Sequence, residues 1–177
     1  MIKSKRDLFR YLQQDIKNSH FNPTFMNYLF SDMWCFHRRL RRLEYFLNTK
    51  RGKFWKIIIK IEKYRFKKIS KKLGFSIPPN VFGPGLCIPH YGTIVVNRKV
   101  RIGENCKIHT CTNIGADFND PDSFPTLGNN CYIGPGAKLF GNIKIADGVK
   151  IGANAVVNKS CEVEGAVLLG VPAKIHS

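Results

Sequence analysis

Hydrophobic positions in the second half of the chain recur every six residues. Aliphatic side chains stand at 127, 133, 139, 145, 151 and 157, and the same count continues to Val163 and Leu169. Small or branched residues recur four places after them, as at Cys131, and Gly often follows the aliphatic residue directly. Neither an α-helix nor an alternating strand has this period. The pattern predicts a parallel β-helix of triangular coils, each of ~18 residues, with Cys106, Cys131 and Cys161 pointing inward from one shared position.

The six-residue count breaks at two places. The same register runs upstream through Ile114, Ile108, Ile102 and Val96, but the step from Val96 back to Ile88 is eight, and His90 lies inside that slip. The step from Ile114 to Leu127 is thirteen, so the stretch ADFNDPDSFP at 116–125 must loop out. Insertions in a repeat fold form loops on one face, often the binding face. We therefore expect His90 and this loop to contribute to one site.

Helical spacing dominates the region before the repeats, at positions 1–75. Ser4 followed by Asp7 indicates a helix start, and Asn22-Pro23 predicts a second one, followed by an apolar stripe from Phe25 to Leu40. A third helix is expected over 53–73.

The predicted fold class is mainly β. It consists of a basic α-helical region at 1–75 and a β-helix at 76–177, the latter interrupted by an inserted loop at 116–126.

Positive charge is concentrated in the helical region. The chain has 29 Lys and Arg against 12 Asp and Glu, a formal net charge of +17. Lysines there either face water around a small bundle or bind an anionic membrane surface or another polyanion. Nucleic acid is not an expected partner, because no recognised motif accompanies the charge.

The cysteines and the start of the sequence suggest a compartment. Six cysteines form no CxxC pair and no zinc-type spacing, which favours reduced thiols and no metal site. The first residues lack the pattern of a secretory signal, and no apolar run reaches ~20 residues. We expect a cytoplasmic protein, with peripheral membrane contact through the basic helices as a further expectation.

Three motifs resemble the hexapeptide-repeat acetyltransferases. They are His-x-Gly-x-x-Val-Val from His90, IGPGAKLFGNI in the middle, and GVPAK near the end. The likeness covers about residues 76–176. It is similar to the serine O-acetyltransferase branch and, in kind, to the capsular and colanic-acid O-acetyltransferases related to it. The resemblance implies a left-handed β-helix, a homotrimer, and acetyl-CoA bound between neighbouring subunits.

The resemblance also assigns roles to residues. His90 matches the catalytic histidine, and histidine suits a general base at neutral pH because its ordinary pKa is about 6.5. His109 follows one coil later and is a possible second site histidine. Cofactor-binding positions carried over or inferred for acetyl-CoA are Ala116 at the oxyanion, Pro135 and Ala153 at the coil edge, and Lys159 and Lys174 for the phosphates.

Departures from the serine acetyltransferase pattern suggest a changed acceptor. Phe75 and Pro89 stand where that family has aspartates, and Ser123-Phe124 replaces its Arg-His. A serine carboxylate normally needs a cationic partner. An aromatic ring beside carboxylates suits a sugar better, so the expected acceptor-binding residues are Asp117, Asp120, Asp122 and Phe124.

The main prediction is therefore transfer of acetyl from acetyl-CoA to a sugar hydroxyl of a capsular polysaccharide, an exopolysaccharide or a precursor. Two alternatives stay open: a serine O-acetyltransferase of cysteine biosynthesis, and a non-enzymatic basic trimer that binds membranes or polyanions.

Overall fold

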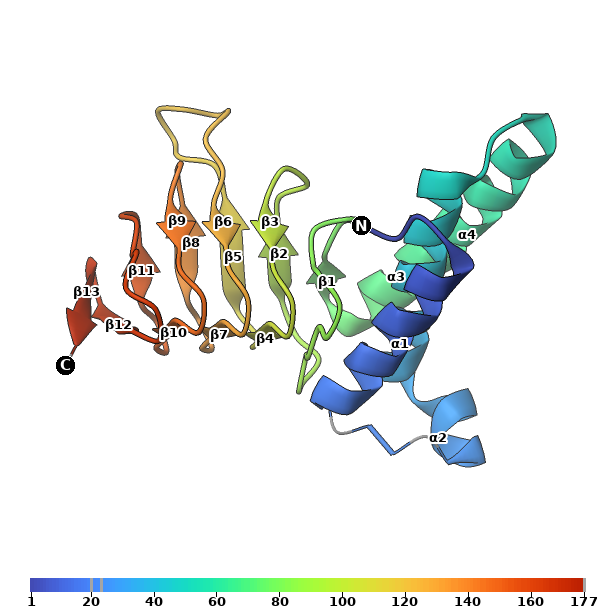
Figure 1. Ribbon diagram of the computed structural model, residues 1–177, viewed down its shortest axis with the longest axis horizontal. Helices are drawn as coiled ribbons and strands as arrows, with labels where there is room; N and C mark the ends of the chain where they lie inside the picture. The colour runs from blue at the N-terminus through green and yellow to red at the C-terminus, as the bar shows by residue number, and fades with distance from the viewer. Residues whose placement is uncertain (20, 23, 177) are drawn as a thin grey trace.

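Helices lie at one end of the molecule and a stack of short strands at the other (Figure 1). The structure is a computed structural model that describes residues 1–19, 21–22 and 24–176. The helices are α1 (Lys5–Ser19), α2 (Phe25–Phe30), α3 (Asp32–Thr49) and α4 (Lys53–Leu73). None of the described helices is both long and apolar enough to cross a bilayer.

Within the described residues the strands form three sheets, which are the sides of the β-helix. Sheet A contains β1 (Phe75–Ser76), β2 (Ile94–Val96), β5 (Thr112–Gly115), β8 (Lys138–Phe140) and β11 (Val156–Val157). Sheet B contains β3 (Arg101–Ile102), β6 (Thr126–Leu127) and β9 (Lys144–Ile145). Sheet C contains β4 (Lys107–Ile108), β7 (Tyr132–Ile133), β10 (Lys150–Ile151), β12 (Val167–Gly170) and β13 (Ala173–His176). Because most of each coil is turn, helices hold more residues than strands, and "mainly β" is too simple a class.

Strand register confirms the predicted coil. Ile133 pairs with Ile151, which lies three repeats later, and their side chains are fully buried. Ile108 pairs with Ile133, which is more than three repeats later, because the inserted loop 116–125 lies between them in the sequence. The backbone bridge between Phe82 and Ile102 spans three repeats plus the two additional positions of the His90 slip. Both breaks in the count are therefore confirmed as insertions in the turns.

The last coil departs from the six-residue count. Val163 and Leu169 are predicted to point inward but are 55% and 40% exposed, whereas Leu168 is 4% exposed. Ile151 pairs with Leu168 rather than Leu169, and Cys161 bridges to Ile145. The turn after Val157 is therefore two residues shorter than the count and the following turn one residue longer, so the interior position moves by two places at Cys161 and by one at Leu168. Cys161 is buried as expected, but it occupies the aliphatic position rather than the one that Cys106 and Cys131 share.

The helical predictions hold except at one break. The Asp7 amide donates to Ser4 Oγ at 3.0 Å, so α1 begins at the predicted cap, and α4 has the predicted bounds. The stripe from Phe25 to Leu40 is split into α2 and α3, because Ser31 is extended and caps α3 through its hydroxyl. Phe25 is consequently exposed. Thr24 caps α2, and the Pro23 half of the predicted Asn22-Pro23 start lies outside the described residues.

Buried charges join the helices to the first coil. Arg41 and Asp15 are fully buried and form a two-bond ion pair with N···O distances of 2.9 and 3.1 Å. Arg41 also donates to Glu44 and to the carbonyl oxygens of Phe82 and Gly83. Asp15 Oδ1 accepts hydrogen bonds from the backbone amides of Gly85 and Leu86. Side chains of α1 and α3 thus satisfy backbone groups at the open end of the β-helix.

Candidate functional site

His90 lies in the turn that leads from the sheet C side of a coil to β2 of sheet A. Two observations fix its neighbours: the Ile108 amide donates to the Cys87 carbonyl just before the turn, and a Cβ on Gly92 would lie 3.0 Å from the Thr110 side chain. We call the line of turns joining sheet C to sheet A the His90 corner; its members are 89–93, 109–111, 134–137 and 152–155. The imidazole is exposed there, so a substrate can reach it.

The next coils place two predicted cofactor positions along the His90 corner. The Gly136 amide donates to the Thr110 carbonyl at 2.9 Å, and the Asn154 amide donates to the Pro135 carbonyl at 2.8 Å. These bonds stack Pro135 and Ala153 below the turn of His90, and both residues are exposed. A ligand lying along this corner would contact backbone groups of successive coils.

His109 belongs to the same corner and is half-buried. Its ring lies 5.1 Å from that of Tyr132, and its Nε2 is buried with no hydrogen-bond partner among the described residues. Burial lowers the pKa of His109, and the positive charges of Lys107 and His90 lower it further. The neutral form of the His109 imidazole is therefore favoured at pH 7.

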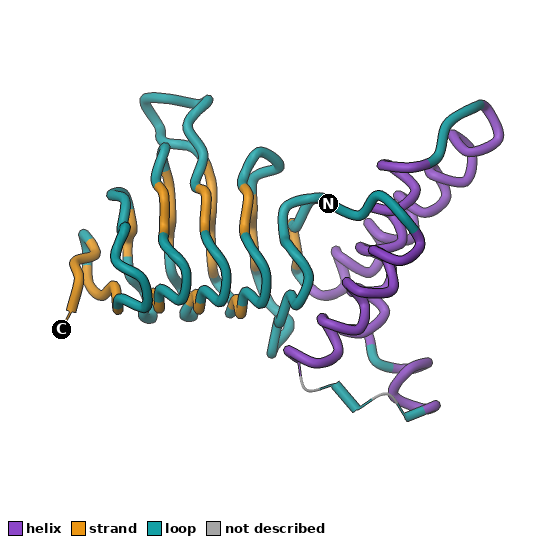
Figure 2. The backbone as a smooth tube through the Cα atoms, in the orientation of Figure 1, coloured by secondary structure: helices purple, strands orange, loops and turns teal. Residues whose placement is uncertain are grey.

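The inserted loop lies on the other side of sheet A. It connects β5 to β6, and it projects beyond the other turns of the β-helix (Figure 2). Turns joining sheet A to sheet B form a second line, the loop corner, which consists of 97–100, 116–125, 141–143 and 158–160. The expectation of one site formed by His90 and this loop is wrong within a single chain, because sheet A separates the two corners.

Contacts inside the loop restrict the expected acceptor residues. Phe124 is half-buried against the core, and Lys99 Nζ lies 4.9 Å from its ring centroid. Lys99 also pairs with Asp122 at 2.5 Å, and this charged hydrogen bond lowers the pKa of Asp122. The Asp120 carbonyl holds the turn by accepting from Ser123 Oγ at 2.6 Å. Phe124 is therefore a packing residue and does not present an open ring to a sugar.

A cavity of about 540 Å³ lies on the outer face of sheet A, beside the loop. Ala116 and Asp117 line it, together with Asn113 of β5 and Lys138 of β8. Lys138 Nζ donates to the Cys111 carbonyl, so this cation points toward the edge of sheet A that adjoins the His90 corner. Sequence reasoning missed Lys138 and Asn113. Their outward position on strands of known register was the signal that could have found them.

The remaining predicted cofactor lysines lie on two different sides of the β-helix. Lys159 is exposed at the loop corner, and sheet A separates it from Pro135 and Ala153. Lys174 is exposed on β13 and pairs with Leu169, whose side chain lies against Gly152, next to Ala153. Within the described residues, no group of three or more His, Cys, Asp or Glu side chains is arranged to hold a metal ion.

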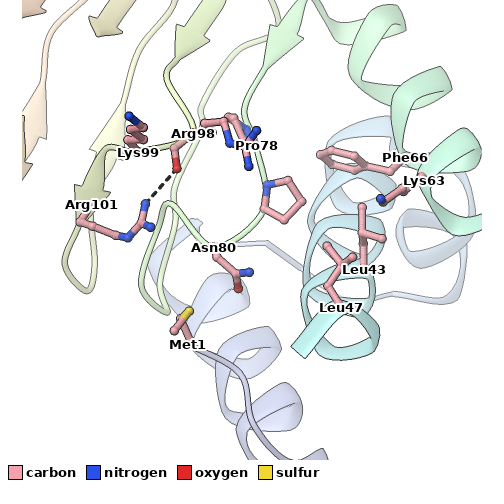
Figure 3. A pocket seen from close by; sticks show the side chains of 11 residues that line it. Met1, Leu43, Leu47, Lys63, Phe66, Pro78, Asn80, Arg98, Lys99 and Arg101 are labelled. Atoms are coloured by element: carbon pink, nitrogen blue, oxygen red, sulfur yellow. Dashed lines mark hydrogen bonds between the residues drawn. The ribbon is translucent and has the colours of Figure 1, made fainter. Parts of the chain in front are cut away.

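A second cavity, of about 860 Å³, contains none of the predicted site residues (Figure 3). Apolar side chains of α3 and α4, such as Leu43 and Phe66, line one side of it. Cations line the other side, where Arg101 Nη1 donates to the Arg98 carbonyl at 2.9 Å. Because the histidines lie at another corner, this cavity is not where the predicted chemistry is placed.

Comparison with known proteins identifies the repeat. The family model "Bacterial transferase hexapeptide (six repeats)" matches residues 124–159. A serine acetyltransferase of Helicobacter pylori strain J99 is 36% identical over 124 residues, which are 64% of this chain and 72% of that protein. A serine acetyltransferase of Buchnera aphidicola is 37% identical over 117 residues, but this chain spans only 42% of its length.

Solved structures agree on the fold. A serine acetyltransferase in complex with CoA has a TM-score of 0.77 at 25% identity, over 97% of this chain and 71% of that one. The soybean serine acetyltransferase apoenzyme also has a TM-score of 0.77, at 23% identity, over 97% and 70%. These matches include the helices. The predicted hexapeptide-repeat fold, a left-handed β-helix preceded by helices, is confirmed.

The prediction of a polysaccharide acetyltransferase is wrong. The relatives described above are serine acetyltransferases, and the likeness to capsular or colanic-acid enzymes has no support among them. The error came from reading Phe124 as an exposed sugar-stacking ring, whereas Lys99 covers it and the core contacts it.

The repeat and the relatives indicate the same family. The Helicobacter pylori protein is 36% identical to this chain, and the match covers 72% of that protein. The chain belongs to the serine acetyltransferase family of hexapeptide-repeat transferases.

Proposed function

We propose that this protein transfers the acetyl group of acetyl-CoA to the hydroxyl oxygen of L-serine. The observation that carries the proposal is the position of His90, an exposed histidine in an insertion at the corner of a hexapeptide β-helix. Related proteins named serine acetyltransferases support the acceptor, and a related structure that contains CoA supports the donor.

His90 is the general base in this reaction. As the serine oxygen attacks the thioester carbonyl carbon, the imidazole takes the hydroxyl proton. The carbon–sulfur bond then breaks, and His90 returns the proton to the departing CoA thiolate, which leaves as the free thiol. Pro135 and Ala153 lie below His90 on the same corner, and their backbone groups would align CoA there.

A second copy of the chain would complete the site. His90 and the loop that contains Ala116 and Asp117 lie at opposite edges of sheet A within one chain. In a homotrimer, the loop corner of one subunit would face the His90 corner of the next. The oxyanion-binding amide near Ala116 and the exposed Lys159 would then reach acetyl-CoA from the neighbouring subunit.

Lys138 replaces the missing Arg-His pair in this proposal. Serine carries a carboxylate and an ammonium group, and each needs an opposite charge. The cavity on sheet A offers both signs, because Lys138 and Asp117 line it together. Lys138 would bind the carboxylate and Asp117 the ammonium group.

The test is CoA thiol release from acetyl-CoA, with L-serine or ethanolamine as acceptor. Ethanolamine has the same hydroxyl and amine but no carboxylate. We expect release with L-serine, a loss of about 10²- to 10⁴-fold in His90→Ala, and a reduced preference for L-serine over ethanolamine in Lys138→Met. Lys144→Met, which removes an exposed lysine from sheet B, is the matched control. No release with L-serine, or full activity in His90→Ala, would refute the proposal.

A further inference from the structure

Helix α4 presents an apolar stripe to solvent. Phe54, Ile57, Ile61 and Tyr64 are 67%, 62%, 44% and 69% exposed. Their spacing of three and four positions places them on one side of the helix. The opposite side packs against α3 and β1 through Phe66, Ile69 and Leu73. Large apolar side chains gathered on one outward face are typical of an interaction surface.

Lysines flank this stripe almost without acidic neighbours. Every lysine of α4 is exposed, at 53, 56, 60, 63, 67, 68, 71 and 72. The single acid of the helix, Glu62, is buried and is held by Arg39, Arg42 and Arg65. Lys72 pairs with Asp32, and within the described part of the chain no other α4 lysine has a carboxylate within ion-pair distance. The outward face of α4 is therefore both apolar and strongly cationic.

We propose that α4 docks the protein on the surface of an anionic lipid bilayer. A helix with exposed aromatic and aliphatic side chains beside a row of lysines lies in the membrane interface, its apolar stripe among the acyl chains and its ammonium groups at anionic headgroups. A second copy of this chain is a poorer occupant, because two such faces would bring their lysines together. The membrane contact is independent of the reaction at the His90 corner.

Flotation of the purified protein with vesicles tests this inference. One vesicle preparation contains phosphatidylcholine alone, and the other contains phosphatidylcholine with phosphatidylglycerol. Lys56→Gln/Lys60→Gln/Lys63→Gln removes three charges beside the stripe. Lys5→Gln/Lys144→Gln/Lys150→Gln removes three exposed charges elsewhere and is the matched control. Ile57→Ser/Ile61→Ser removes apolar area from exposed positions, and thermal melts establish that every variant is folded.

The expected result is binding to the anionic vesicles and little to the neutral ones. The α4 lysine triple variant should partition about a hundredfold less, the control triple variant should be far less affected, and the serine double variant should bind weakly even at low salt. Absence of binding to anionic vesicles would overturn the inference. Equal losses in the two triple variants would also overturn it, since binding would then follow net charge alone. An unchanged double variant that sediments as a smaller assembly than wild type would assign the stripe to a second copy.

Discussion

Replacing Arg41 by Met tests whether buried charges join the helices to the β-helix. The guanidinium makes hydrogen bonds of 2.9 and 3.1 Å to Asp15, 3.0 Å to Glu44, and 3.0 and 2.6 Å to two carbonyl oxygens of the first coil. Methionine fills similar volume but leaves the two carboxylates buried without their cation. Removing one partner of a buried ion pair costs about 3–5 kcal/mol. For a chain of this size, the melting temperature should fall by roughly 6–20 °C.

Thermal and urea unfolding followed by circular dichroism measure this loss. Arg42→Met is the matched control, because Arg42 is exposed and its partner at 3.6 Å, Glu62, would keep Arg39 and Arg65. That change should cost less than about 1 kcal/mol. Equal destabilisation by the two substitutions would refute the reasoning.

Acid sensitivity gives a second measure of the same cluster. Burial alone would raise the pKa of Asp15, but the charge of Arg41 and the hydrogen bonds from His37 and Arg41 outweigh it and hold the pKa at about 2. A depressed carboxyl pKa stabilises the fold above the ordinary value near 3.8, and this contribution is lost as the pH falls from about 4 toward 2. Burial raises the pKa of Glu44 above its ordinary value of 4.5, so Glu44 takes up its proton at higher pH and does not counter the loss between about pH 4 and 2. Arg41→Met should therefore lose less stability over this pH range than the wild type.

Two further predictions concern the His90 corner and the coil register. Lys107→Gln should raise the pKa of His109, because it removes a nearby positive charge, and proton NMR titration of the imidazole measures this. An unchanged titration would mean that the charge of Lys107 does not act on His109. Ile151→Ala should cost about 2–5 kcal/mol at a fully buried position, whereas Val163→Ala at a 55% exposed one should change stability by less than about 0.5 kcal/mol in urea unfolding. Comparable losses would contradict the shortened last turn.

Periodicity predicted most of the β-helix, because an interior position in every coil must be apolar. The count located both insertions and failed only after Val157, where one turn is shorter and nothing in the residue types marks the shortening. The break between α2 and α3 was equally hidden, since Ser31 lies within an otherwise apolar stripe.

The site was less predictable than the fold. A motif identifies His90, but the sequence does not reveal that sheet A separates it from loop 116–125. Phe124 and Asp122 looked like ligands because the sequence does not show that Lys99 contacts both of them. Lys99 lies in a different turn of the β-helix. Lys138 was overlooked because an outward lysine on a short strand has no distinctive neighbours in the sequence.

The Arg41 cluster has a consequence for self-assembly. A β-helix coil exposes unpaired amides and carbonyls at its end, and such an end is a template for stacking another molecule into a fibre. Arg41 and Asp15 occupy carbonyls and amides of the first coil, and α1 and α3 cover that surface. The helices therefore protect this end of the β-helix against end-to-end polymerisation, a role that is independent of any chemistry at the His90 corner.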